Sequence, residues 1–198
     1  ENYPLSEAFD HAFRHIVEEN SKINKDEARN RELTAYGRCD FRNGTDTVSA
    51  YEQIQLYNCY YMRRAYSAAR ALFESNGGWL FSAVRNLSGR VVFCDLSYET
   101  GASGLAFIDA CRRLPHLDLT YMGIYPTKEM DDIALQFFQS EAYRHATHCF
   151  YPRISAVPAS FWAAHAVLSE LIIFNVSSLF DRISAREARS LALEINQL

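Results

Sequence analysis

The chain has 198 residues, of which 48% are hydrophobic and 22% are charged, and its formal net charge is −4. This composition is typical of a globular protein and excludes an intrinsically disordered chain. The small negative charge gives no general attraction to nucleic acid or to anionic lipid, so neither is expected as a partner.

The cysteine pattern indicates a reducing compartment. The five cysteines are scattered, none forms a Cys-x-x-Cys pair, and three lie in apolar runs, which is typical of buried free thiols. We expect no signal peptide. The longest apolar run, Val167–Phe174, contains Ser169 and Glu170 and is too short to span a bilayer. The sequence therefore predicts a cytoplasmic protein without a membrane segment.

The first part of the chain is predicted to be helical. A first helix is expected from about residue 5 to residue 19, where apolar side chains recur at helical spacing. The polar stretch 20–47 is expected to hold a short helix and a loop. His11 and His15 lie four residues apart on the first helix, but no Glu accompanies them in a His-Glu-x-x-His pattern, so we predict no metal site.

A long second helix is predicted from Ser49 to about Asn76. Ser49 and Glu52 have the spacing of a capping box, which satisfies the free N–H groups at a helix start. The glycine pair at 77–78 is expected to end this helix. The segment 57–66 is dense in Tyr and Arg, and we interpret its tyrosines as core residues with their hydroxyls at the rim. The predicted apolar face comprises Ile54, Tyr57, Tyr61, Ala65, Ala68 and Leu72.

The stretch 91–134 has the pattern strand, turn, helix, strand. The apolar run Val91–Cys94 ends in Asp95, and a turn of small and polar residues leads into the apolar helical segment 105–111. The run 119–125 predicts a second strand, which is followed by another helix. This succession is the Rossmann pattern, in which a ligand binds at the carboxyl ends of the strands.

Two more strands and two more helices are predicted after this unit. The strands cover 147–151 and 170–178, and a helix from 160 to 168 lies between them. Ser184 and Glu187 have the spacing of a second capping box, which predicts a last helix that runs to the chain end. The predicted sheet therefore has four strands.

These patterns divide the chain in two. Residues 1–88 are predicted to form an N-terminal helical segment, and residues 89–198 a truncated Rossmann-like domain. The predicted fold class is α/β, with a short, mostly parallel Rossmann-like sheet and an added N-terminal helical segment.

Two turns of this domain resemble the cofactor-binding motifs of class I S-adenosylmethionine-dependent methyltransferases. Asp95 and Gly101 match the acid and one glycine of the family's first motif, Asp-x-Gly-x-Gly-x-Gly. The stretch 123–130, Gly-Ile-Tyr-Pro-Thr-Lys-Glu-Met, matches the second motif except at Tyr125, where the family has an acid for the ribose hydroxyls. The resemblance implies cofactor contacts at Asp95, Ser97, Glu99, Thr100, Gly101 and Tyr125, and substrate-facing side chains at Asn175 and Ser177.

Three positions of these motifs differ from the family pattern. Ser97 and Glu99 stand where the family has glycine, and their Cβ atoms restrict both positive φ and close approach of the backbone to a ligand. Glu99 also adds a negative charge near the expected place of the cofactor's carboxylate. Tyr125 replaces a two-oxygen acceptor by a neutral phenol, which makes weaker hydrogen bonds. The sequence therefore predicts that S-adenosylmethionine binding is weak or lost.

The number of strands leads to a prediction about partners. The methyltransferase sheet normally has seven strands, whereas four are predicted here. The fourth is apolar, and a bare apolar edge is prone to aggregation unless it is covered. We therefore expect the edge Leu171–Val176 to pair with a second copy or with a partner protein, unless further chain beyond residue 198 covers it.

Three functional hypotheses remain open. In the first, the chain is a methyltransferase-like protein with a degenerate cofactor site, and it acts through protein–protein interaction or self-assembly. In the second, it is an active S-adenosylmethionine-dependent methyltransferase with a divergent pocket and an unknown acceptor. Methyl transfer depends largely on positioning an activated sulfonium, so a missing general base does not exclude this hypothesis. The segment 57–66 is similar to the N-terminal helix that caps the cofactor pocket in some of these enzymes. In the third, the pocket binds another nucleotide or a small metabolite as a sensor.

Overall fold

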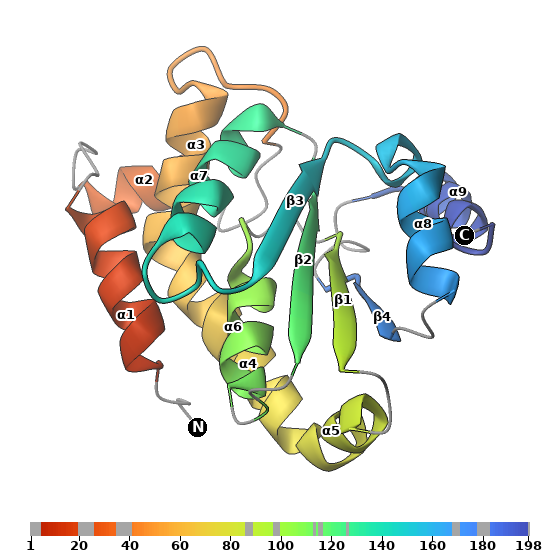
Figure 1. Cartoon of the computed structure of the whole chain (residues 1–198). Coiled ribbons are helices and arrows are strands. Elements are labelled where there is room, and N and C mark those ends of the chain that lie inside the picture. The colour runs from red at the N-terminus through yellow and green to blue at the C-terminus, as the bar shows by residue number, and fades with distance from the viewer. Residues whose placement is uncertain are drawn as a thin grey trace.

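The computed structural model confirms the α/β fold. Its centre is a parallel four-stranded sheet in the order β3-β2-β1-β4 (Figure 1). The order β3-β2-β1 is that of one half of a Rossmann-type sheet, and β4 lies on the other side of β1, as the fourth strand does in that fold. The strands are β1 (Arg90–Asp95), β2 (Asp118–Ile124), β3 (Thr147–Tyr151) and β4 (Leu171–Asn175). The structure describes residues 5–19, 26–34, 41–85, 89–96, 100–112, 114, 117–125, 127–167, 171–177 and 183–197.

Helices cover both faces of this sheet (Figure 1). They are α6 (Ala102–Cys111), α7 (Lys128–Gln139), α8 (Ala159–Val167) and α9 (Ala185–Ile195). Because side chains alternate along a strand, the sheet has two apolar faces. Phe93 and Tyr121 point into the cluster under α6 and α7, whereas Cys94 and Met122 belong to the cluster on the α8 and α9 side.

Most of the N-terminal helices form a further layer outside α6 and α7, and the last of them lies near the amino-terminal end of β1 (Figure 1). They are α1 (Glu7–Phe13), α2 (Glu27–Leu33), α3 (Ala50–Tyr57), α4 (Arg63–Ser75) and α5 (Gly77–Arg85), with π-helical turns at Arg14–Glu18 and Asn58–Met62. The capping boxes at Ser49 and Ser184 are both present, so these two predicted helix starts are confirmed. Among the described residues, no helix is long and apolar enough to cross a membrane.

The π-helical turn between α3 and α4 changes which residues face the core. The predicted apolar stripe holds in α3, where Ile54 is buried, but it is wrong at Leu72, which is 58% exposed. A π-helical turn contains one residue more than an α-helical turn, so the buried face moves to Met62 and Tyr66. The predicted end is also only partly right, because α4 ends at Ser75 but Gly77 begins α5.

Helix α6 is buried on all sides. All ten of its residues are buried, because it lies between the sheet and α4. A helix that is apolar all round is typical of such a central position. One apolar cluster accordingly contains residues of the N-terminal helices, α6, α7 and the sheet together, so the helical layer and the sheet share a core.

Candidate functional site at the carboxyl ends of the strands

Several polar side chains meet at the carboxyl ends of β1, β2 and β4, on the face of the sheet that α6 and α7 cover. Asp95 ends β1, and the strand register pairs it with Gly123 of β2 and with Asn175 of β4. The Asp95 Oδ1 accepts a hydrogen bond from the Asn175 Nδ2 at 2.9 Å, and its Oδ2 accepts one from the Tyr121 hydroxyl at 3.0 Å. Asp95 is fully buried, so both carboxylate oxygens are used inside the protein.

Two tyrosines fill the space in front of this carboxylate. The hydroxyls of Tyr121 and Tyr125 are hydrogen-bonded to each other, and both residues are fully buried. The Tyr121 ring stacks on Phe138 of α7 with the ring centroids 4.1 Å apart. Burial, and then the negative charge of Asp95, raise the pKa of Tyr121 well above its ordinary value, so this phenol stays neutral and can donate to the carboxylate.

The glycines of the turn and of α6 are required by this packing. Gly101 has a φ of 85°, the left-handed conformation that favours glycine, and a Cβ at this position would lie 3.6 Å from the Tyr125 hydroxyl and 3.1 Å from the Phe138 ring. A Cβ on Gly104 would lie 2.0 Å from the Tyr121 ring. The backbone of α6 therefore approaches the tyrosine closely at Gly104.

The structure unites some of the predicted site residues and separates others. Asp95, Tyr125 and Asn175 meet through Tyr121. Thr100 points to the N-terminal layer instead, where its hydroxyl donates to the Asn58 Oδ1. The Ser177 side chain is exposed, with its hydroxyl 3.4 Å from the Ser103 hydroxyl, and Ser97 and Glu99 lie outside the described residues.

The described part of this site does not fit the ribose of an adenosyl cofactor. The position where the resemblance expects an acid is occupied by Tyr125, whose hydroxyl is directed to Tyr121 inside the core. The other carboxylate, Asp95, is enclosed with both of its oxygens paired.

Sequence reasoning missed Tyr121, the residue that joins this network. The signal that could have identified it is strand periodicity, because residues 121, 123 and 125 share one face of a strand. Gly123 lies between the two tyrosines, and a Cβ there would lie 2.8 Å from the Tyr125 ring. The polar contact between Asn58 and Thr100 gave no such signal, since it joins two elements that are far apart in the sequence.

A groove lies at the same strand ends on the opposite face. It has a volume of about 240 Å³ and runs between the sheet and α9. Leu96 and Ile124 contribute apolar surface, and Arg153 and Glu194 contribute charges of both signs. No group of three or more His, Cys, Asp or Glu side chains in the described parts of the chain is arranged to hold a metal ion.

Comparison with known proteins adds no family assignment. The sequence matches no protein-family profile, and no curated protein is significantly similar to it. The chain is therefore assigned only a fold, an α/β fold with a Rossmann-like strand order.

Proposed function

We propose that this chain is a methyltransferase-like α/β protein that has lost its adenosyl cofactor site and acts through self-assembly. The observation that carries the proposal is the buried network of Asp95, Tyr121, Tyr125 and Asn175. These side chains satisfy one another where a Rossmann-type ligand would bind, so the site is stable without a ligand.

The assembly surface in this proposal is the outer edge of β4. Among the described residues, β4 pairs only with β1. The run 171–176, Leu-Ile-Ile-Phe-Asn-Val, contains no charged residue and no proline, which are residues that protect edge strands from pairing. Two copies of an uncharged edge can pair about a two-fold axis without electrostatic repulsion. We therefore take a second copy of this chain as the partner.

The direction of the β4 backbone groups shows which amides such pairing would protect from hydrogen exchange. The Leu96 N–H donates to the Asn175 carbonyl at 2.9 Å, so Asn175 faces β1. Because backbone groups of successive residues point to opposite sides of a strand, the N–H groups of Ile172 and Phe174 are expected to face outward. These two amides report directly on the edge.

The first experiment tests the cofactor part of the proposal. The purified chain is titrated calorimetrically with S-adenosylmethionine and with S-adenosylhomocysteine, at ligand concentrations up to about 1 mM, a range that detects all but the weakest binding. We expect no saturable heat. Micromolar binding of either compound would contradict the loss of the cofactor site.

The second experiment tests the assembly part on the same sample. Light scattering is expected to give a mass of a dimer or larger assembly, and hydrogen exchange at Ile172 and Phe174 is expected to slow as protein concentration rises. The substitution Ile172→Pro removes one outward N–H and should give monomers, whereas Ile172→Val keeps the N–H and should not. A wild-type monomer with rapid exchange at both amides would refute self-assembly, even if the proline variant fails to fold.

The alternative is an active S-adenosylmethionine-dependent methyltransferase with a divergent pocket, and the groove beside α9 is the observation that favours it. Its arginine and glutamate side chains complement the carboxylate, ammonium and hydroxyl groups of that cofactor. If the titration gives saturable heat, Arg153→Ala and Glu194→Ala should each weaken it under this alternative. Binding heat that neither substitution changes would exclude the groove as the cofactor site.

A further inference from the structure

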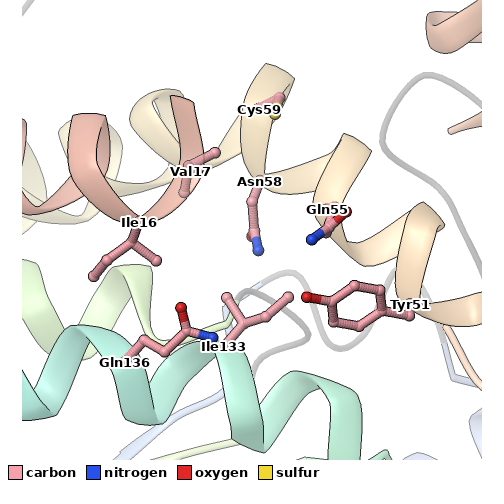
Figure 2. Close-up of a pocket in the computed structure, with 8 residues that line it drawn as sticks. All are labelled: Ile16, Val17, Tyr51, Gln55, Asn58, Cys59, Ile133 and Gln136. Carbon is pink, nitrogen blue, oxygen red and sulfur yellow. The ribbon is translucent and has the colours of Figure 1, made fainter. Parts of the chain in front are cut away.

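A separate cavity lies between the N-terminal layer and α7. Figure 2 shows its eight lining side chains around one space. They come from both π-helical turns, from α3 and from α7: Ile16, Val17, Tyr51, Gln55, Asn58, Cys59, Ile133 and Gln136. π-Helical turns occur frequently at functional sites, and here two of them meet at one cavity.

One buried polar atom of the cavity lacks a hydrogen-bond partner. Asn58 is only 1% exposed, and its Oδ1 accepts from the Thr100 hydroxyl. Its Nδ2 is buried and has no partner among the described residues, and Figure 2 shows this amide directed into the cavity. An exchange of the amide oxygen and nitrogen would leave the oxygen facing the same space, so in either orientation a polar atom faces the cavity unpaired.

The other lining groups define the chemistry that such a ligand would have. None of the eight lining residues is charged, so the cavity offers no counter-charge for a phosphate or a carboxylate. Gln55 and Gln136 contribute carboxamides, which both donate and accept hydrogen bonds. Ile16 and Ile133 add apolar surface. Apolar walls with a few convergent polar groups are characteristic of small-molecule sites.

The cavity is large enough to hold more than a single water molecule. Its volume is about 80 Å³, counted as the space open to the centres of water-sized molecules, which is several times the roughly 10–15 Å³ that one buried water needs on that measure. Tyr51 and Gln136 are exposed residues, so the cavity opens to solvent at their side and a ligand can enter without unfolding the layer.

We propose that this cavity binds an uncharged nucleobase, either free or as the base of a neutral nucleoside. A nucleobase is planar, uncharged, and carries hydrogen-bond donors and acceptors side by side on its edge, as the carboxamides of Gln55, Asn58 and Gln136 require. Its faces contact the aliphatic side chains. The hydrogen bond from Thr100 holds the Asn58 carboxamide, which connects the site to the turn that follows β1.

The test is calorimetric titration of the whole chain with adenine, with uracil and with orotate, which is uracil bearing a carboxylate. We expect saturable binding of at least one neutral base at concentrations up to about 10 mM, and orotate at least about tenfold weaker than uracil, because its charge would enter a site without a counter-charge. Failure of both neutral bases to bind would overturn the proposal. Orotate binding as tightly as uracil would also overturn it.

Matched variants locate the binding. Gln55→Leu and Gln136→Leu each remove a carboxamide from the cavity and should weaken base binding about tenfold. Gln139→Leu is the control, because Gln139 is exposed on the same helix as Gln136 but does not line the cavity. Binding that survives both cavity substitutions would place the ligand elsewhere and refute the assignment.

A second measurement needs no variant. Cys59 lines the cavity, whereas Cys94 and Cys111 are buried in the core. Alkylation of wild-type Cys59 by iodoacetamide, followed by mass spectrometry of its peptide, should slow in proportion to occupancy by the base. An unchanged rate at a base concentration that saturates the calorimetric signal would contradict the proposal. Gln136 lines this cavity and is not part of the Asp95 network, so S-adenosylmethionine heat that Gln136→Leu abolishes would belong to this cavity and not to the Rossmann-type site.

Discussion

Asp109 is the residue on which the attachment of the N-terminal layer most depends. Its Oδ2 accepts hydrogen bonds from the hydroxyls of Ser6 at 2.6 Å, Tyr66 at 2.6 Å and Tyr143 at 2.8 Å, and its Oδ1 accepts one from the Arg112 Nε at 2.5 Å. Because Ser6 caps α1 and Tyr66 lies on α4, one carboxylate of α6 holds both helices.

The two tyrosines cannot replace this acceptor. Tyr66 and Tyr143 are fully buried, and burial, followed by the charge of Asp109, raises the pKa of each above its ordinary value. Both phenols therefore remain neutral donors at neutral pH. Removal of the carboxylate leaves the Tyr143 hydroxyl without its acceptor, whereas the Tyr66 hydroxyl keeps the Ser6 Oγ at 3.0 Å.

We predict that Asp109→Ala destabilises the protein by about 3 to 5 kcal/mol. The unpaired Tyr143 phenol costs about 1 to 3 kcal/mol, the lost hydrogen bonds from Ser6, Tyr66 and Arg112 add to this, and the relief of a buried charge offsets part of the total. This loss is a large fraction of the roughly 5 to 15 kcal/mol that stabilises a typical domain.

Urea unfolding followed by circular dichroism measures this free energy. Asp118→Ala is the control, because Asp118 is 62% exposed and forms only a 3.5 Å ion pair with Arg90, so it should cost under about 1 kcal/mol. Adding Tyr143→Phe to Asp109→Ala should recover part of the loss, since the unpaired hydroxyl is then absent. Equal losses for Asp109→Ala and Asp118→Ala would refute the reasoning.

Two other substitutions test the packing and the electrostatics. Gly104→Ala should destabilise the protein by about 2 to 4 kcal/mol in the same assay, because the new Cβ would lie 2.0 Å from the Tyr121 ring. A change below about 0.5 kcal/mol, which is typical of a neutral surface substitution, would contradict the close approach of α6 to Tyr121. Burial, and then the charge of Asp132, raise the pKa of Asp131 from its ordinary value to about 6. The folded state therefore binds the Asp131 proton more tightly than the unfolded state does. As a result, the stability of the protein falls as the pH rises through about 6. Asp131→Asn should therefore stabilise the protein by about 1 kcal/mol at neutral pH, a figure reduced for partial solvent exposure. The gain should vanish below the ordinary pKa of the carboxyl; a gain that is the same at both pH values would show that charge is not its cause.

The elements that the sequence predicted well are those with local signals. Ser49 and Ser184 each cap a helix with a glutamate three residues later, and both helix starts are where the pattern indicates. The four strands follow apolar runs bounded by polar residues, and their pairing is parallel, as predicted for most of the sheet. These signals involve neighbouring residues, so one sequence is sufficient to read them.

The features that the sequence did not predict depend on contacts between distant segments. The π-helical turn at Asn58–Met62 leaves a local pattern that reads as an ordinary helix, yet it moves the buried face from Leu72 to Tyr66. The buried roles of Asp109 and Asn58 depend on Tyr143 and Thr100, which lie 34 and 42 residues away. Spacing in a single sequence does not record such pairs.

Under the proposed function, the glycines of the turn and of α6 are required by packing and not by a ligand. Glycine in a cofactor turn permits positive φ and close approach of a ligand, and Gly101 keeps that conformation. Here the group that approaches is the chain's own Phe138 ring at Gly101, with the Tyr125 hydroxyl next to it, and the Tyr121 ring at Gly104. A side chain that fills a cofactor's space imposes the same steric requirement as the cofactor, so the presence of glycine alone does not distinguish a working site from a filled one. The residues around Asp95 carry more information, because each oxygen of this buried carboxylate already accepts a hydrogen bond from the chain's own Tyr121 or Asn175.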